Sequence, residues 1–176
     1  MAAEAYNLRY VDEVWVIPCG DRPDKKLKTP GEHRLKMTQL LVSDFFADDF
    51  PIKVNDVEIK NGPSIPTYQL IKKLQDDPAN KNYEFYFILG SDLLDGLIKW
   101  DDGEKLVSEV NFIIFIRIGY QLKTDKLPKK YIVVHTSFVG SSSTEIRNRI
   151  RNHHRDLEES VEKLTLNADP SVDQGQ

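Results

Sequence analysis

The sequence is poor in cysteine, because Cys19 is the only one among its 176 residues. A single thiol excludes a disulfide within the chain and is typical of proteins from a reducing compartment. No apolar run approaches the roughly 18 residues of a membrane span, and residues 1–10 lack the apolar core of a secretory signal. We therefore expect a cytoplasmic protein with no membrane partner, and the nucleus stays open as an alternative.

The chain also lacks an excess of positive charge. Its 24 lysines and arginines are outnumbered by 28 aspartates and glutamates, which gives a formal net charge of −4. No global field favours nucleic acid as a partner, so any anion site has to be local. The length and the 40% hydrophobic content predict one globular domain over residues 1–168 and a polar, disordered tail over residues 169–176.

Short apolar runs alternate with helical patterns along the chain. This alternation predicts an α/β fold with a mainly parallel sheet flanked by helices. The run at residues 112–117 is nearly solid apolar, as expected of a strand buried on both faces. In such sheets, ligands bind at the carboxyl ends of the strands. The expected strands cover residues 14–18, 52–57, 85–89, 112–117 and 131–134, and the expected helices cover residues 30–44, 68–76, 100–109 and 143–153.

The segment SSSTEIR, at residues 141–147, lies between an apolar run and a helical pattern. Ser142, Ser143 and Thr144 can cap the free N–H groups at a helix start, and those same groups favour a bound phosphate. Arg147 lies about one turn further on, where its guanidinium could hold phosphate oxygens. An ordinary helix cap followed by a solvated arginine fits this segment as well.

Two other loops carry residues that suit a nucleotide. Lys25 and Lys26 lie close to the end of the first apolar run, where a basic loop could neutralise a triphosphate. A solvated charge run is the simpler interpretation of the two lysines. Gly90 lets a ligand approach the backbone, and Asp92, two residues on, suits ribose hydroxyls. A turn with a helix cap explains that pair equally well.

Three further residues are candidates for contact with a ligand. Thr67 lies at the start of a helix, where it is either an N-cap or a ligand-contacting hydroxyl. Trp100 is either a core anchor or an aromatic plate. Arg117 ends an apolar strand at its carboxyl end, which adds weight to a role in ligand binding.

Other basic side chains are less informative. Arg34 lies in the first turn of a helix, an unfavourable place for a cation, and either a nearby phosphate or solvent exposure would relieve the conflict. His153 and His154 are adjacent rather than at the i, i+4 spacing of a helical metal pair. We therefore predict no protein-bound metal.

From about Val11 to Arg151 the chain resembles the nicotinamide/nicotinate mononucleotide adenylyltransferases of the nucleotidyltransferase superfamily. The resemblance rests on five blocks in the same order: VDEVWVIPCGDRPDKK…HR, VEIKNGPSIPTY, FYFILGSDLL…KW, FIIFIRIGY and SSTEIR. It implies a Rossmann-like domain that joins ATP to the mononucleotide with Mg²⁺ and releases pyrophosphate, as in NAD biosynthesis. The preference for NMN or NaMN stays open, and so does a homo-oligomer.

The resemblance also implies a role for each candidate by position. No nucleophilic side chain is needed, because the phosphate of the mononucleotide is the attacking group, and catalysis depends on positioning and charge neutralisation. The implied ligands of ATP are Gly90, Asp92, Ser142, Ser143, Thr144 and Arg147; those of the mononucleotide are Thr67, Trp100 and Arg117; and the implied catalytic cations are Arg147, Lys25 and Lys26.

One part of the family pattern is absent from the sequence. The family's first strand and its H-x-G-H loop have no counterpart, because no histidine here is followed by x-Gly-His. That strand belongs near the middle of the sheet, so its neighbours would either close up or leave unpaired edges. Three interpretations follow: a shortened form of the enzyme, a noncatalytic nucleotide binder or one completed by a partner chain, or another branch such as a phosphopantetheine adenylyltransferase or a cytidylyltransferase. We favour the first.

Overall fold

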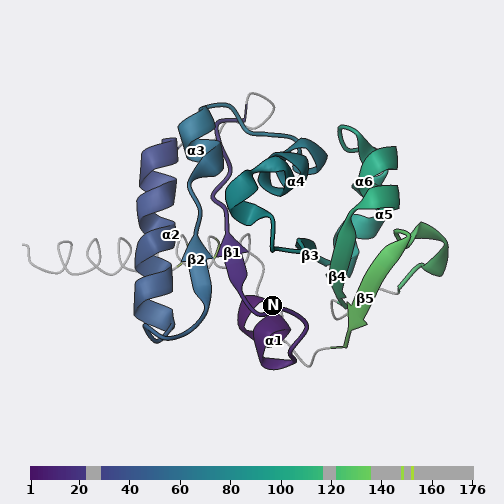
Figure 1. Cartoon of the computed structure of the whole chain (residues 1–176), viewed down its shortest axis with the longest axis horizontal. Coiled ribbons are helices and arrows are strands. Elements are labelled where there is room, and N and C mark those ends of the chain that lie inside the picture. Colours follow the sequence, from purple (N-terminus) through teal and green to yellow (C-terminus); the bar gives the residue numbers. More distant parts are fainter. Residues whose placement is uncertain (23–28, 117–121, 136–147, 149–151, 153–176) are drawn as a thin grey trace, which may run out of the picture. The chain divides into compact units, whose positions relative to one another are not determined.

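The computed structural model describes residues 1–22, 29–116, 122–135, 148 and 152 (Figure 1). Its contacts divide the chain into Met1–Thr136 and Ser137–Gln176, and the fold described below is that of the first unit. Within the predicted helix at residues 143–153, positions 148 and 152 are described, and both are helical. The predicted tail at residues 169–176 lies outside the described residues.

In the described part of the chain, five strands form two sheets, and every pairing is parallel. This confirms the predicted parallel α/β architecture, but the sheet is divided between its first two strands and its last three. The smaller sheet pairs β1 (Val14–Val16) with β2 (Ile52–Val54), and the larger has the order β3 (Tyr86–Gly90), β4 (Asn111–Phe115), β5 (Lys130–Val134).

The helices lie between and around these strands (Figure 1). Helix α4 buries Leu70, Ile71 and Leu74, which share one face of the helix. The helices are α1 (Ala2–Asn7), α2 (Gly31–Phe45), α3 (Val57–Asn61), α4 (Thr67–Asp76), α5 (Leu94–Leu97) and α6 (Gly103–Glu109), with short 3₁₀ turns η1 (Pro78–Asn80), η2 (Ser91–Leu93) and η3 (Thr124–Lys126).

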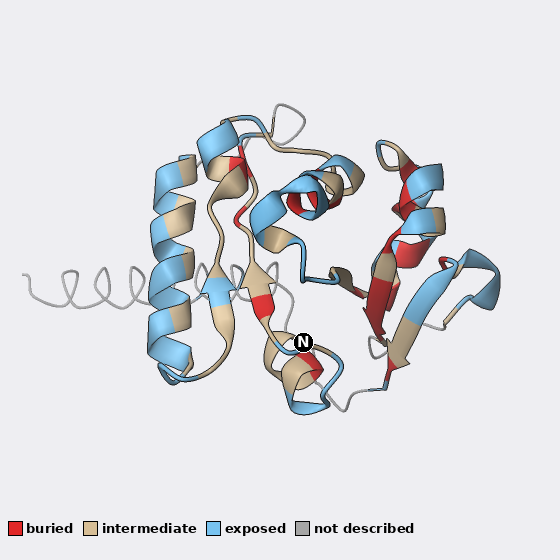
Figure 2. Cartoon of the chain, in the orientation of Figure 1, coloured by how far each residue is buried: buried red, intermediate tan, exposed pale blue. Residues whose placement is uncertain are grey.

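Alternate residues of β4 face two separate apolar clusters. Phe112 and Ile114 pack into one cluster with residues of α4, α5 and α6. Ile113 and Phe115 pack into the other, together with Ala5 from α1. Figure 2 shows β4 as the most continuously buried strand. The expectation of a strand buried on both faces is therefore confirmed.

Several expected elements end earlier or begin later than their patterns indicate. The strand expected over residues 14–18 ends at Val16, and the strand expected over residues 112–117 ends at Phe115. The strand expected over residues 52–57 ends at Val54, because the Asn55 side chain accepts a hydrogen bond from the Val57 N–H at 2.9 Å and α3 begins there. The helix expected over residues 100–109 begins only at Gly103, since Asp102 has a left-handed φ of 54°. Trp100 therefore lies in the turn before α6.

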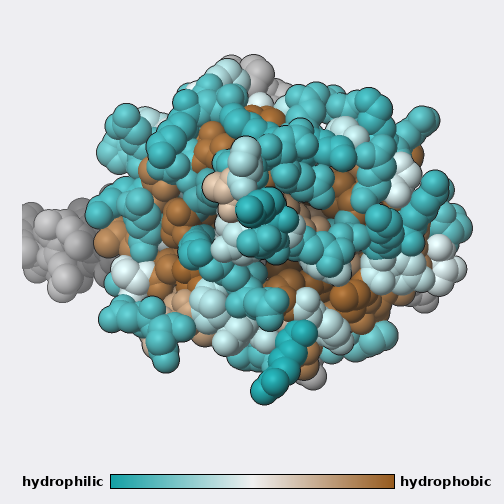
Figure 3. Space-filling view, in the orientation of Figure 1, coloured by the Kyte–Doolittle hydropathy of each residue, from teal (hydrophilic) through white to brown (hydrophobic). Residues whose placement is uncertain are grey.

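The surface is mixed in character. Helix α2 has no buried residue, and it exposes large apolar side chains such as Phe45, which is 78% exposed. Figure 3 shows apolar surface breaking through the polar surface of the face in view. Among the described residues, no helix combines the length and apolar content that crossing a membrane would require.

Candidate functional site

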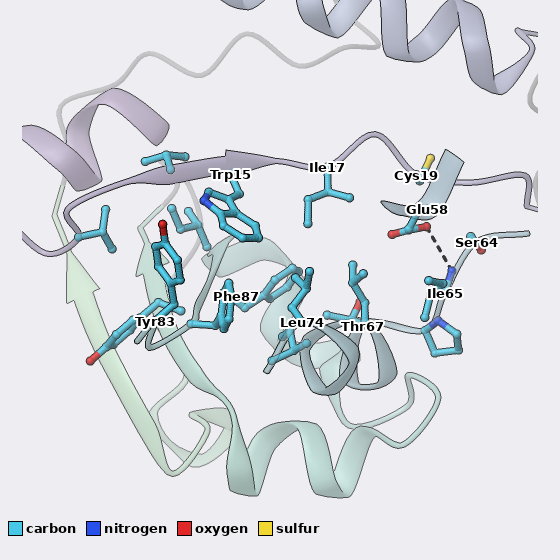
Figure 4. Close-up of a pocket in the computed structure, with 18 of the residues that line it drawn as sticks. Trp15, Ile17, Cys19, Glu58, Ser64, Ile65, Thr67, Leu74, Tyr83 and Phe87 are labelled. Carbon is cyan, nitrogen blue, oxygen red and sulfur yellow. Dashed lines mark hydrogen bonds between the residues drawn. The ribbon is translucent and has the colours of Figure 1, made fainter. Parts of the chain in front are cut away.

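A large cleft lies between the two sheets of the Met1–Thr136 unit. Its volume is about 1360 Å³, and its lining comes from β1, β3, α4 and the loops that follow β1 and α3. Figure 4 shows Trp15 and Ile17 on one wall, with Phe87, Leu74 and Thr67 across from them. Because β1 and β3 do not pair, side chains from both strands are free to line this space.

A buried carboxylate ties together the two loops at one end of the cleft. Glu58, in α3, is 6% exposed. Its Oε2 accepts hydrogen bonds from the Gly20 N–H at 2.9 Å and from the Ile65 N–H at 3.2 Å. Figure 4 shows Glu58 beside Cys19 and Ile65 at this end. One side chain thus joins the segment after β1 to the segment before α4.

The same two loops also touch through their backbones. The Asp21 N–H donates to the Gly62 carbonyl at 2.7 Å, and the Ser64 N–H donates to the Asp21 carbonyl at 2.8 Å. A Cβ at Gly20 would lie 2.7 Å from the Gly62 oxygen. Glycine at position 20 is therefore required by the close approach of the two chains.

The structure gives a local reason for the cation in the first turn of α2. The Arg34 guanidinium donates to the carbonyls of Thr29 and Cys19, and it lies 3.1 Å from an Asp21 carboxylate oxygen. Its side chain is 13% exposed, so simple solvent exposure is the wrong explanation for its position. Arg34 holds the loop that leaves β1.

Two of the residues that the resemblance assigns to the mononucleotide, Thr67 and Trp100, line the same cleft. Thr67 is the first residue of α4, but the N-cap is Pro66 and no side-chain cap hydrogen bond is made, so the N-cap interpretation of Thr67 is wrong. The Trp100 ring lies edge-on to Phe87, with ring centroids 6.3 Å apart, and packs against the larger apolar cluster. Trp100 thus serves as a core anchor and as part of the cleft wall.

Gly90 and Asp92 lie at the carboxyl end of β3, where the sequence places them. A Cβ at position 90 would lie 2.5 Å from Asp92 Oδ1, so the carboxylate packs over the bare Cα of the glycine. Neither residue is among those that line the cleft. The structure therefore pairs Gly90 with Asp92 but does not bring them into the cleft with Thr67 and Trp100.

The remaining candidates lie outside the described residues. They are Lys25, Lys26, Arg117, Ser142, Ser143, Thr144 and Arg147.

A polar cluster beside the cleft connects α4 to α6. The Tyr68 hydroxyl donates to a Glu109 carboxylate oxygen at 2.7 Å. This hydrogen bond raises the pKa of Tyr68 to about 12 and lowers the pKa of Glu109 below its usual value. The Gln69 amide donates to Asp102 at 3.1 Å and is the main cause of a lowered Asp102 pKa. These contacts fix the helix that carries Thr67 relative to the turn that carries Trp100.

Sequence reasoning missed the residues that shape this end of the cleft. Glu58 and Gly20 belong to two of the blocks that carry the family resemblance, yet nothing in the neighbouring sequence marks Glu58 as buried or Gly20 as its hydrogen-bond donor. A glutamate within a short helical run is usually a solvated residue. The contact that gives each residue its role comes from a segment about 40 positions away.

In the described part of the chain, no three His, Cys, Asp or Glu side chains lie close enough together to hold a metal ion. In enzymes that use nucleotides, Mg²⁺ commonly arrives bound to the phosphates of the nucleotide, and the protein holds the ion with only one or two carboxylates.

Comparison with known proteins places the chain in a family. No family model matches it. A protein of Oceanobacillus iheyensis named probable nicotinate-nucleotide adenylyltransferase is 34% identical over 154 residues, which cover 86% of this chain and 75% of that protein. A protein of the same name from Clostridium novyi is 33% identical over 163 residues, with 86% and 78% covered. The chain belongs to the nicotinate-nucleotide adenylyltransferase family.

Solved structures agree with this assignment. The nicotinic acid mononucleotide adenylyltransferase of Plasmodium falciparum, complexed with NaAD, aligns with a TM-score of 0.70 at 33% identity, over 84% of this chain and 73% of that one. The same enzyme complexed with APC aligns with a TM-score of 0.66 at 30% identity, over the same shares. The resemblance inferred from the five sequence blocks and the Rossmann-like fold are both confirmed.

Proposed function

We propose that this member of the family transfers the adenylyl group of ATP to nicotinate mononucleotide, giving the deamido dinucleotide and pyrophosphate. The observation that carries the proposal is that Thr67 and Trp100, from two separate segments, line one cleft. The names of the relatives favour the nicotinate over the nicotinamide substrate.

The pyridine end of the site is built on described residues. The Trp100 ring stacks on the pyridine ring, and the Thr67 hydroxyl contacts the mononucleotide from the first turn of α4. Stacking on an aromatic plate contributes about 1–3 kcal/mol for each base. Glu58 does not touch the substrate in this proposal. It positions the loops beside Thr67 by holding the N–H groups of Gly20 and Ile65.

The adenylate end of the site uses Gly90 and Asp92 at the end of β3, where the glycine admits the nucleotide and the carboxylate holds ribose hydroxyls. The remaining contacts to substrate are proposed for residues outside the described part. Arg117 borders the mononucleotide, and the phosphate ligands are Lys25, Lys26, Ser142, Ser143, Thr144 and Arg147.

In the transfer step, an oxygen of the mononucleotide phosphate attacks the α-phosphorus of ATP. The bond from that phosphorus to the bridging oxygen breaks, and pyrophosphate leaves with the electron pair. Mg²⁺ bound to the ATP phosphates supplies charge neutralisation, and Arg147, Lys25 and Lys26 add positive charge where the transition state becomes more negative. The protein contributes orientation and electrostatics and no covalent intermediate.

Binding and turnover are measured separately on the purified chain. Tryptophan fluorescence follows titration with nicotinate mononucleotide and, in a second series, nicotinamide mononucleotide. Pyrophosphate release is then assayed with ATP and Mg²⁺. We expect saturable binding that is tighter for the nicotinate form and that Thr67→Val weakens. Lys73→Ala is the matched control, since Lys73 is an exposed residue of the same helix that does not line the cleft.

The loss of one charge-stabilising donor from an active site typically lowers the rate by about 10²–10³. Because the sequence has no H-x-G-H signature, the expected turnover is slow, and binding is the more sensitive readout. Folded protein that shows neither a fluorescence change with either mononucleotide nor any pyrophosphate release would contradict the proposal. Binding without turnover would identify a noncatalytic member of the family.

A further inference from the structure

The turn that carries Trp100 has a backbone conformation that few residue types adopt. Asp102, two residues after Trp100, has a left-handed φ of 54°. Among the described residues it shares a positive φ with Arg9 and otherwise only with glycine. Such conformations are costly for residues with a side chain, and they cluster at functional sites where the surrounding structure maintains them. The left-handed residue therefore marks this turn as a candidate for a functional role.

The backbone of the turn is tightly closed. The Gly103 N–H donates to the Trp100 carbonyl at 2.8 Å, and the Trp100 N–H donates to the Leu97 carbonyl at 3.2 Å. A Cβ at Gly103 would collide with the Ile98 carbonyl, so the close approach requires glycine. Because the turn is this compact, a change in the conformation of Asp102 is transmitted to Trp100.

One hydrogen bond joins this turn to the neighbouring helix. The Gln69 amide donates to Asp102 Oδ2 at 3.1 Å, and Gln69 is the third residue of α4, two positions after Thr67. Neither Gln69 nor Asp102 lines the cleft, whereas Thr67 and Trp100 both do. The hydrogen bond thus lies outside the cleft, and each of its two residues is two positions from a side chain in the cleft wall.

The other polar contacts near this turn have different places in the fold. The Tyr68 hydroxyl donates to Glu109 at 2.7 Å, but Glu109 is the last residue of α6, so this contact holds the far end of that helix. Lys105 pairs with Asp102 at 3.2 Å from within α6 itself. Gln69 is therefore the residue of α4 that holds the turn before α6.

We propose that Gln69 and Asp102 are positioning residues, and that the hydrogen bond between them fixes the Trp100 ring where the mononucleotide binds. This inference rests on the proposed function, in which Trp100 stacks on the pyridine ring and Thr67 contacts the same substrate. The energy of an aromatic contact depends on the position and orientation of the ring. A turn that is free to relax therefore loses affinity for the mononucleotide, although the ring itself is unchanged.

Variants at two positions separate positioning from stability. Asp102→Gly removes the acceptor but suits the left-handed φ, because glycine adopts positive φ without steric cost. Asp102→Asn keeps an oxygen that can accept from Gln69, and asparagine also tolerates this conformation. Gln69→Ala removes the donor and leaves the turn unaltered. Glu104→Ala is the matched control, since Glu104 is an exposed acidic residue of α6 that does not line the cleft.

Two measurements are made on each variant. Calorimetry gives the Kd for nicotinate mononucleotide, together with the melting temperature of the free protein. Fluorine NMR of the full chain labelled with fluorotryptophan reports the surroundings of Trp100 without any ligand, and the Trp100 signal is assigned by its loss in Trp100→Phe. The second measurement does not depend on whether the mononucleotide binds.

We expect Asp102→Gly and Gln69→Ala each to raise the Kd about 3–10-fold, a part of the roughly 5–150-fold equivalent of the whole stack. The double variant should lose no more affinity than either single variant, because both changes remove the same hydrogen bond. Asp102→Asn and Glu104→Ala should bind within about twofold of the unmodified chain, since they remove only exposed charge. The Trp100 signal should shift in Asp102→Gly and Gln69→Ala and stay in place in the two other variants. All melting temperatures should fall by less than about 4 °C.

Three results would overturn the inference. The first is an unchanged Kd in Asp102→Gly and Gln69→Ala while the unmodified chain binds, and this result would leave the proposed function standing. The second is an additive loss in the double variant, which would mean that the two residues act separately. The third is a Trp100 signal that both variants leave unchanged. If the unmodified chain does not bind the mononucleotide, the proposed function fails, and a shifted Trp100 signal would still support the positioning of the ring by this hydrogen bond.

Discussion

Replacement of Glu58 tests how much the end of the cleft depends on one buried carboxylate. Its Oε2 is the acceptor for both N–H groups, that of Gly20 at 2.9 Å and that of Ile65 at 3.2 Å. In Glu58→Ala both donors lose their acceptor. A buried donor left without a partner costs about 1–3 kcal/mol, so the two together predict a loss of about 2–6 kcal/mol in the free energy of unfolding.

Glu58→Gln is the matched control, because one oxygen accepts both hydrogen bonds. The amide oxygen of glutamine can take that position and keep both bonds, although each becomes a neutral bond. Hydrogen bonds to a charged group contribute about 1.5–3 kcal/mol, against about 0.5–1.5 kcal/mol for neutral ones. We therefore expect Glu58→Gln to lose clearly less stability than Glu58→Ala.

Urea denaturation followed by tryptophan fluorescence measures both variants, and an unchanged m-value shows that the denatured state is comparable. Titration of the folded variants with nicotinate mononucleotide, without urea, then measures how far the position of these loops affects binding. Glu58→Ala should weaken binding more than Glu58→Gln, although the side chain touches no substrate. If the two variants unfold at the same urea concentration, the carboxylate is not the acceptor that holds these loops.

Three further predictions concern single contacts. Trp100→Ala should raise the Kd for nicotinate mononucleotide, measured by calorimetry, about 5–150-fold, which is the equivalent of the stacking energy. Trp100→Phe should retain most of the affinity, and equal losses in the two variants would exclude stacking. Gly20→Ala should lower the free energy of unfolding by about 1–3 kcal/mol, because its Cβ would lie 2.7 Å from the Gly62 oxygen; an unchanged melting temperature would contradict this. Ultraviolet titration should show one tyrosine that ionises near pH 12 and that is missing in Tyr68→Phe, because the hydrogen bond to Glu109 raises the pKa of Tyr68 from 10.0 to about 12 in the folded protein. That hydrogen bond stabilises the fold below pH 10, and its contribution is lost as the pH rises through 12.

Much of the fold could be predicted from the sequence because its signals are local. The run that became β4 is apolar at nearly every position, and a strand between two helical layers requires this pattern. The apolar residues of α4 recur at helical spacing, so the predicted helix at residues 68–76 differs from α4 by one residue. The family was also predictable, since five ordered blocks are a specific signal even though each is weak.

The parts that sequence reasoning missed depend on contacts between distant segments. Nothing local in Glu58 indicates that it accepts from Gly20, because that contact forms only when the loop after β1 approaches α3. The same reason explains Arg34, whose partners are carbonyls of the loop it holds. The division of the sheet is a third case. Hydrophobic patterns predict where strands form, but they do not show which neighbours are paired.

The divided sheet and the candidate site are physically linked. The loop after β1 carries Cys19 at one wall of the cleft, while Trp100, at another wall, packs on Phe87 of β3, so the walls of the cleft rest on different sheets. Ring contacts of Trp15 with Tyr83 and Phe85, at 5.5 and 5.3 Å, connect these sheets across the cleft. The distance between these walls therefore depends on the packing of the three rings.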